Sequence, residues 1–142
     1  MPAPENNQPR IIYKAAIALF KDNKILMARD TDNKLAFYTP GGKIEENETA
    51  IECAVREVKE ELGVDLNPDT AKLLGTFEAP AHNRDNTLVN ISLYTGEIKG
   101  VPKPTSEIVE LRYFDSSVDS KHLTPVLTEK IFPWLKEHGY IN

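Results

Sequence analysis

Three glutamates within five consecutive residues, Glu57, Glu60 and Glu61, have the residue type and spacing to bind a metal ion. On a helix of about 3.6 residues per turn they fall within about 100° of one another and share one face. Like charges three or four residues apart destabilise a helix by roughly 0.2–0.5 kcal/mol per pair. A hard divalent cation such as Mg²⁺ prefers carboxylate oxygens and water, so it would turn this repulsion into a binding site. The alternative is a solvated acidic face without chemistry.

The helix that must carry these glutamates is predicted over residues 49–62. Thr49, followed three residues later by Glu52, forms a capping-box pattern, and Gly63 is the residue type that commonly follows a helix end. An apolar stripe about 60° wide would face the core; it consists of Ile51, Val55, Val58 and Leu62. A further sector, suited to solvent, holds Glu52, Arg56 and Lys59. The small residues Ala50 and Cys53 lie beside the glutamates and would leave room for a hydrated ion.

The loop before this helix has features that suit a ligand site. Pro40, Gly41 and Gly42 would let the main chain approach a ligand closely, and a backbone carbonyl there could complete the coordination of a metal ion. A simple tight turn is the alternative reading of the two glycines. Three acidic residues then precede the helix, where its dipole favours negative charge; they are Glu45, Glu46 and Glu48.

Residues 42–64 read GKIEENETAIECAVREVKEELGV, and this segment resembles the complete signature of the Nudix hydrolases. Its nine constrained positions are Gly42, Glu48, Arg56, Glu57, Val58, Glu60, Glu61, Gly63 and Val64. The resemblance implies an α/β fold, namely a Nudix-type α/β/α sandwich with a mixed β-sheet and a central catalytic helix. It also implies hydrolysis of a nucleoside diphosphate linked to another group, with Mg²⁺ as the cofactor and Mn²⁺ as an alternative ion.

The resemblance also implies roles for individual residues. The implied metal ligands are Glu57, Glu60, Glu61, the carbonyl of Gly41 and, from a late strand, Glu107. The implied catalytic group comprises Glu57 and Glu60 as candidate general bases, with Glu107 as an outside candidate for that role. It also includes Glu48 as a carboxylate lining the site and Arg56 as the arginine that orients the glutamates. This chemistry is coherent, because a metal ion neutralises phosphate charge and lowers the pKa of bound water, whose proton a nearby carboxylate can accept.

The remaining candidates would contact other parts of the substrate. Arg29, at the end of an expected strand, could reach phosphates or could simply be a surface arginine. Phe37 and Tyr38 could stack on a base, with packing in the core as the alternative. The polar loop at residues 82–85 could close over the ligand or be solvated. The full set of substrate-binding candidates is Arg29, Phe37, Tyr38, Lys43, His82 and Arg84.

Strand patterns flank the predicted helix on both sides. We expect a hairpin formed by residues 11–20 and 25–29, with residues 21–24 as its turn. The other expected elements are strands at residues 35–38, 72–78, 88–98 and 108–114 and an amphipathic helix at residues 125–138, ended by Gly139. Residues 1–10 read as a flexible tail and residues 11–142 as a single domain.

Composition narrows the choice of partners and compartment. The 142 residues carry a formal net charge of −5 and no Lys/Arg cluster, which argues against duplex nucleic acid as a partner. Cys53 is the only cysteine, so the chain has no internal disulfide and suits a reducing compartment. The apolar run at residues 11–20 is too short to span a bilayer. We therefore expect a cytoplasmic protein with a small nucleotide as its partner, as a monomer or homodimer and without a membrane contact.

The substrate itself is left open between two classes. The short chain resembles the compact, MutT-like members that act on nucleoside triphosphates, including damaged ones, and this is our first expectation. Pro80, sixteen residues after Val64, resembles instead the marker of members that act on ADP-ribose or nucleotide sugars. There are two further alternatives. The first is a non-catalytic Nudix module that senses a nucleotide, and the second is an acidic interaction surface.

Overall fold

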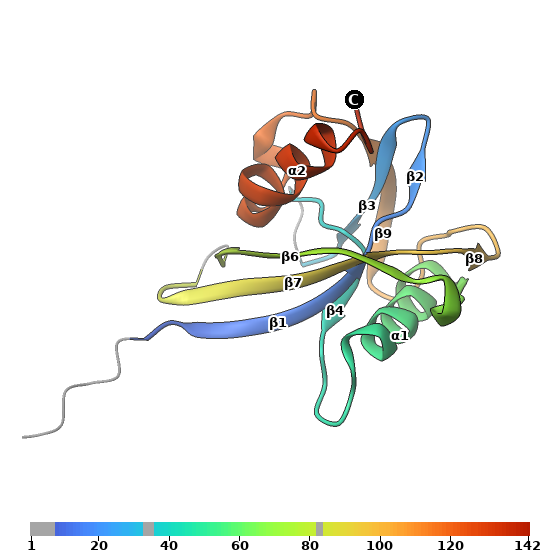
Figure 1. Cartoon of the computed structure of the whole chain (residues 1–142), viewed down its shortest axis with the longest axis horizontal. Helices are drawn as coiled ribbons and strands as arrows, with labels where there is room; N and C mark the ends of the chain where they lie inside the picture. The colour runs from blue at the N-terminus through green and yellow to red at the C-terminus, as the bar shows by residue number, and fades with distance from the viewer. Residues whose placement is uncertain (1–7, 33–35, 82–83) are drawn as a thin grey trace, which may run out of the picture.

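The computed structural model of the chain describes residues 8–32, 36–81 and 84–142 (Figure 1). The strands are β1 (Arg10–Ile17), β2 (Phe20–Lys21), β3 (Lys24–Asp30), β4 (Gly41–Lys43), β5 (Asp65–Leu66), β6 (Lys72–Pro80), β7 (Thr87–Thr95), β8 (Ile98–Lys99) and β9 (Ile108–Phe114). The helices are α1 (Ala50–Leu62) and α2 (Phe132–Glu137), with 3₁₀ turns at Pro68–Thr70 and Ser120–His122 and a π-helical turn at Leu127–Ile131.

The largest sheet is mixed, as expected. Its strand order is β4-β1-β7-β6. The central pair, β1 and β7, is parallel and runs in register from Arg10 opposite Thr87 to Ile17 opposite Tyr94. The pairs β1–β4 and β6–β7 are antiparallel. A second sheet, β2-β3-β9, is antiparallel, and β5 pairs with β8.

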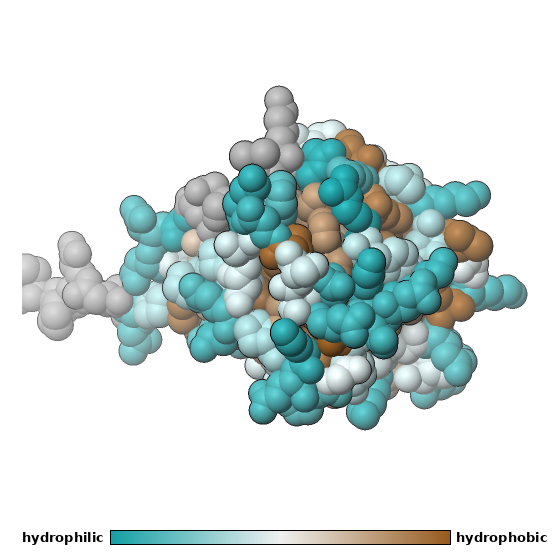
Figure 2. Space-filling view, turned by 90° about the horizontal axis from the view of Figure 1, so that it is seen from above, coloured by the Kyte–Doolittle hydropathy of each residue, from teal (hydrophilic) through white to brown (hydrophobic). Residues whose placement is uncertain are grey.

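Helices cover the two faces of the mixed sheet (Figure 1). Because successive side chains of a strand point to opposite faces, Ala15 of β1 packs with α1 residues such as Val58, whereas Ala16 joins the cluster around Leu135 of α2. The α/β sandwich with a mixed sheet is therefore confirmed. Viewed from the α2 side, the surface is largely hydrophilic, with hydrophobic residues in smaller groups between the polar ones (Figure 2).

Local signals define α1 as predicted. The hydroxyl of Thr49 accepts a hydrogen bond from the Glu52 amide (3.2 Å), and the Glu52 carboxylate accepts one from the Thr49 amide (2.9 Å), which confirms the capping box. Gly63 ends the helix in the left-handed region at φ 69°. The buried side of α1 is rotated relative to the predicted stripe, because Cys53 is fully buried and Val55 is only partly buried. Cys53 therefore belongs to the core.

The predicted hairpin between residues 11–20 and 25–29 is wrong. β1 ends at Ile17 and pairs with β7 and β4, whereas the hairpin joins β2 to β3 in the other sheet. Its turn contains fewer residues than expected, because Lys21 already pairs with Lys24. The two turn residues, Asp22 and Asn23, are both at positive φ (53° and 59°). Two positive φ values are what tight two-residue hairpin turns require, and Asp and Asn tolerate them better than most residues.

Several predicted boundaries also shift. Arg10, which we placed in the tail, is the first residue of β1, and residues 1–7 lie outside the described residues. Phe37 and Tyr38 form only isolated bridges, and Leu35 is not among the described residues. The predicted strand at residues 88–98 is divided into β7 and β8. In the described part of the chain, no helix is both long and apolar enough to cross a membrane.

Candidate active site

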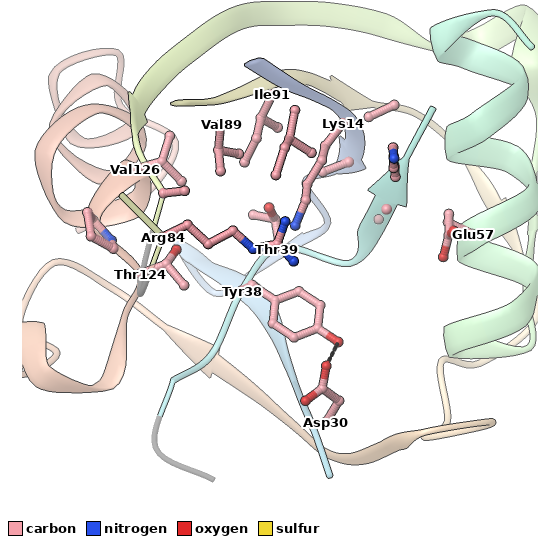
Figure 3. Close-up of a pocket in the computed structure, with 18 of the residues that line it drawn as sticks. Lys14, Asp30, Tyr38, Thr39, Glu57, Arg84, Val89, Ile91, Thr124 and Val126 are labelled. Atoms are coloured by element: carbon pink, nitrogen blue, oxygen red, sulfur yellow. Dashed lines mark hydrogen bonds between the residues drawn. The ribbon is translucent and has the colours of Figure 1, made fainter. Parts of the chain in front are cut away.

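A cavity of about 740 Å³ lies where β1, β3, β4 and β7 meet α1 (Figure 3). Residues 124–126, ahead of the π-helical turn, and Glu107, ahead of β9, complete its wall. The cavity gathers both charged and apolar side chains. Seven of the predicted metal-binding, catalytic or substrate-binding residues line it; they are Tyr38, Gly41, Lys43, Glu57, Glu61, Arg84 and Glu107.

Glu57 and Glu61, one helical turn apart, form the acidic wall from α1. Glu61 is 2% exposed, and its Oε1 accepts a hydrogen bond from the Gly41 amide (2.7 Å). Burial raises the pKa of Glu61 to about 8, and the charges of Glu57 and Glu107 add to the effect. Burial also raises the pKa of Glu57. Burial therefore opposes ionisation of both carboxylates, and a bound cation would favour it.

Arg56 does not occupy the solvent sector that we expected. Its Nε and Nη2 donate to the two oxygens of Glu48 (2.7 and 3.0 Å), and its Nη1 donates to Oε1 of Glu57 (2.8 Å). This hydrogen bonding is the main reason why the pKa of Glu48 falls to about 2. The loop that carries Glu48 folds back along α1, which brings an acceptor to Arg56 that a helical wheel does not include. Arg56 thereby links Glu48 to Glu57.

Glu60 and Glu107, two further predicted metal ligands, lie in different surroundings. The Glu60 side chain is 54% exposed, lies 3.5 Å from Arg56 and is not part of the cavity lining. Glu107 does line the cavity, from the segment that precedes β9, and its carboxylate accepts a hydrogen bond from the Ser106 hydroxyl (2.6 Å). The structure thus brings Glu57, Glu61 and Glu107 to the cavity and leaves Glu60 outside it.

The carboxylates of Glu57, Glu61 and Glu107 have the chemistry to bind a hard divalent cation. Carboxylate oxygens are the ligands that Mg²⁺ prefers, and a cation would offset the burial and the like-charge repulsion that raise the pKa of Glu57 and Glu61. Over residues 8–32, 36–81 and 84–142, no three His, Cys, Asp or Glu side chains converge closely enough to hold a metal ion. In this arrangement Glu57 accepts a hydrogen bond from Arg56, and Glu61 accepts one from the Gly41 amide.

Gly41 contributes in a way that sequence reasoning missed. We expected its carbonyl to face a metal ion, whereas the contact that the structure provides is from its amide to Glu61. A Cβ at position 41 would lie 2.6 Å from the Cα of Ala16 and would also collide with the carbonyl of Ala15. Glycine at this position therefore lets β4 approach β1 closely enough to orient Glu61.

The structure does not bring Arg29 or Phe37 to the cavity, contrary to expectation. Arg29 pairs with Glu110 (3.0 Å), its neighbour in the β3–β9 register, so cross-strand pairing holds it away. Phe37 is 4% exposed and packs edge-to-face on Phe114 (4.9 Å), which leaves no face for a base. Tyr38, Lys43 and Arg84 do line the cavity, and His82 lies outside the described residues.

Sequence reasoning missed Lys14, Asp30 and the apolar end of the cavity. Lys14 is a half-buried lysine of β1, and a lysine inside an otherwise apolar run was the signal for it. Burial lowers its pKa, and the charge of Arg84 lowers it further. The Tyr38 hydroxyl donates to Oδ2 of Asp30 (3.1 Å) and lies 3.4 Å from Oε2 of Glu61, so it links two acidic side chains of the wall.

Comparison with known sequences agrees with this geometry. A family model described as the NUDIX domain matches residues 12–135. The ADP-ribose pyrophosphatase of Methanocaldococcus jannaschii is 37% identical over 97 residues, which make up 67% of this chain and 56% of that relative. The match thus spans little more than half of the relative's length.

Solved structures resemble the fold over most of the chain. The NUDIX hydrolase from Nitrosomonas europaea has a TM-score of 0.71 at 20% identity and covers 93% of each chain. The MutT protein from Methanosarcina mazei Go1 has a TM-score of 0.72 at 17% identity, over 92% of this chain and 96% of that one. At these identities the likeness concerns the fold alone.

Proposed function

The chain belongs to the Nudix family, and we propose that it hydrolyses a phosphoanhydride bond in a nucleoside diphosphate linked to another group. The observation that carries this proposal is that Glu57 and Glu61, from the signature helix, share one cavity with the cations Lys14 and Arg84. Carboxylates suited to a metal ion thus face cations suited to phosphates. This combination matches what hydrolysis between two anionic groups requires.

The proposed cofactor is Mg²⁺, with Mn²⁺ as an alternative, because Nudix hydrolases generally use divalent metal ions. Glu57 and Glu61 would hold it, and Glu107 lines the same cavity. When bound, the ion would neutralise phosphate charge and lower the pKa of a coordinated water. Arg56 would keep the Glu57 carboxylate oriented through its 2.8 Å hydrogen bond.

A carboxylate on the cavity wall would accept the proton of the attacking water. Glu57 fits this role better than Glu60, because Glu57 lines the cavity and Glu60 does not. Within the described chain, Oε2 of Glu57 has no hydrogen-bond partner, so it is available to a water. Glu61 is less suited, because hydrogen-bond donors already face both of its oxygens.

Two substrate classes remain candidates within this function. The first candidate is the nucleoside triphosphates that the sequence led us to expect. ADP-ribose is favoured by the relative that is 37% identical and bears the name ADP-ribose pyrophosphatase, and by the location of Pro80 on the cavity wall. Both contain a nucleoside attached to two linked phosphates. We propose a cytoplasmic enzyme that acts as a monomer or homodimer, and we retain the nucleotide-sensing module as its alternative.

A substrate panel tests the proposal. Purified protein is assayed with nucleoside triphosphates, ADP-ribose, nucleotide sugars and dinucleoside polyphosphates, each with Mg²⁺, with Mn²⁺ and with a chelator. We expect metal-dependent turnover of at least one compound, its loss in Glu57→Gln, and its retention in Glu46→Gln, which alters an exposed glutamate outside the cavity. No turnover of any compound, or full activity of Glu57→Gln, would contradict the proposal.

A further inference from the structure

Two cationic side chains, Lys14 and Arg84, extend toward one another in the middle of the cavity (Figure 3). Lys14 comes from β1, and Arg84 comes from the segment between β6 and β7. In the described part of the chain, neither side chain has an ion pair or a hydrogen bond with a carboxylate. Surface cations are usually solvated, but Lys14 is half-buried, so its charge lacks both a protein partner and full access to water.

Electrostatics make the charge of the half-buried Lys14 costly without a ligand. The charge of Arg84 opposes protonation of Lys14, in the same direction as burial, while Glu61, Asp30 and Glu57 favour it. The pKa of Lys14 therefore depends on both the second cation and the acidic side chains of the wall. An anion between Lys14 and Arg84 would remove their mutual repulsion and supply the missing hydrogen-bond acceptors.

The location of the pair within the cavity indicates which anion this is. Figure 3 shows Glu57 on one side of the two cations and Val126 on the other, with Val89 and Ile91 beside them. From Glu57 to Val126, the lining of the cavity therefore changes from carboxylates to cations and then to apolar side chains. A substrate with two linked phosphates and an uncharged planar group would match this order.

We propose that Lys14 and Arg84 together bind the phosphate that is not attacked, and direct the group attached to it toward the apolar end around Val126. This inference rests on the proposed function, because it takes the reacting phosphate to lie at Glu57 and Glu61. It identifies Lys14 and Arg84 as specificity-determining residues. The substrates they select are those in which an apolar or aromatic group, such as a nucleoside, is joined directly to the second phosphate.

Binding of AMP tests the site without any reaction, because AMP has one phosphate, an aromatic group and no anhydride bond. Calorimetry of the metal-free protein compares AMP with adenosine for the wild type, Lys14→Met, Arg84→Met and Lys14→Arg. We expect each Met variant to weaken AMP binding about tenfold or more, adenosine binding to stay unchanged, and Lys14→Arg to retain most of the AMP affinity. Lys72→Met, which alters an exposed lysine of β6 outside the cavity, is the control.

Kinetics on a substrate that the wild type hydrolyses supply the second readout. We expect Lys14→Met to raise KM more than it lowers kcat, and Lys14→Arg to restore much of the difference. Circular dichroism and the melting temperature verify that each variant is folded. Equal AMP binding by the wild type and both Met variants, or no AMP binding by the wild type, would overturn this inference. Absence of turnover by the wild type would contradict the proposed function instead.

Discussion

Gly42 of β4 lies directly against the carboxylate of Glu57 on α1. A Cβ at position 42 would lie 2.9 Å from Oε2 of Glu57 and still closer to its Oε1 and Cδ. The first glycine of the signature is therefore required for space. The absence of a side chain at position 42 lets the Glu57 carboxylate remain beside β4, where it lines the cavity.

Replacing Gly42 by alanine should lower the activity and leave the stability of the fold nearly unchanged. The atoms that the new methyl group in Gly42→Ala would meet are the mobile end of Glu57, so we expect that carboxylate to move and the fold to remain. Metal-dependent activity should fall about tenfold or more, because small displacements of catalytic groups are costly, while the melting temperature changes little. Gly75→Ala, whose nearest atoms all belong to Phe77, is the control. Full activity of Gly42→Ala would show that the location of Glu57 is unimportant.

Arg56 should not be replaceable by lysine. Its guanidinium binds both oxygens of Glu48 and one oxygen of Glu57 at the same time, and an ammonium group cannot reproduce this geometry. We expect Arg56→Lys to lower kcat/KM about tenfold or more, because Glu57 loses its orientation. The free energy of unfolding should change by only about 1 kcal/mol, since the pairs are partly exposed to solvent.

Chemical denaturation and steady-state kinetics measure the two effects of Arg56→Lys. Lys59→Gln provides the matched control, because it removes an exposed ion pair with Asp65 from the same helix. Equal losses of kcat/KM in the two variants would mean that the role of Arg56 is not specific to Glu57.

Glu61 should make the metal-free protein less stable as the pH rises. Its pKa is about 8 in the folded protein, against 4.5 as the ordinary value, so the folded state binds this proton more tightly than the unfolded state. The resulting contribution to stability is fully present below pH 4.5 and is lost as the pH rises to about 8. Glu61→Gln, which mimics the protonated form, should therefore become more stable than the wild type at pH 8 and match it near pH 5.

Thermal melts of both proteins with a chelator, at several pH values, measure this difference. Added Mg²⁺ should stabilise the wild type at pH 8 and have little effect on Glu61→Gln, because the ion compensates the ionised carboxylate. A stability difference that does not vary with pH would contradict the raised pKa of Glu61.

Elements specified by local interactions were predictable from the sequence. The capping box at Thr49 and the left-handed Gly63 define α1 within a few residues of chain, so the helix and its glutamates could be located in advance. The strand at residues 108–114 was predicted with the bounds that β9 has. Both follow from patterns of neighbouring residues, which can be recognised without any knowledge of tertiary contacts.

Features that depend on distant parts of the chain were not predictable. Arg29 was expected at the substrate, but the register of β3 with β9 places it opposite Glu110. The partners of Arg56 include Glu48, which a helical wheel omits. Lys14 and Arg84 reach one cavity only because β1 pairs in parallel with β7, and parallel pairing over 77 residues of sequence leaves no local pattern.

Binding of a divalent cation by Glu57 and Glu61 is the central claim, and a Mn²⁺ titration followed by electron paramagnetic resonance tests it most directly. The wild type and Glu46→Gln should bind Mn²⁺ equally, and Mg²⁺ should displace it. Glu57→Gln and Glu61→Gln should each weaken binding about tenfold or more, since each removes a carboxylate ligand. Equal Mn²⁺ affinity in all four proteins, or no binding by the wild type, would contradict the claim.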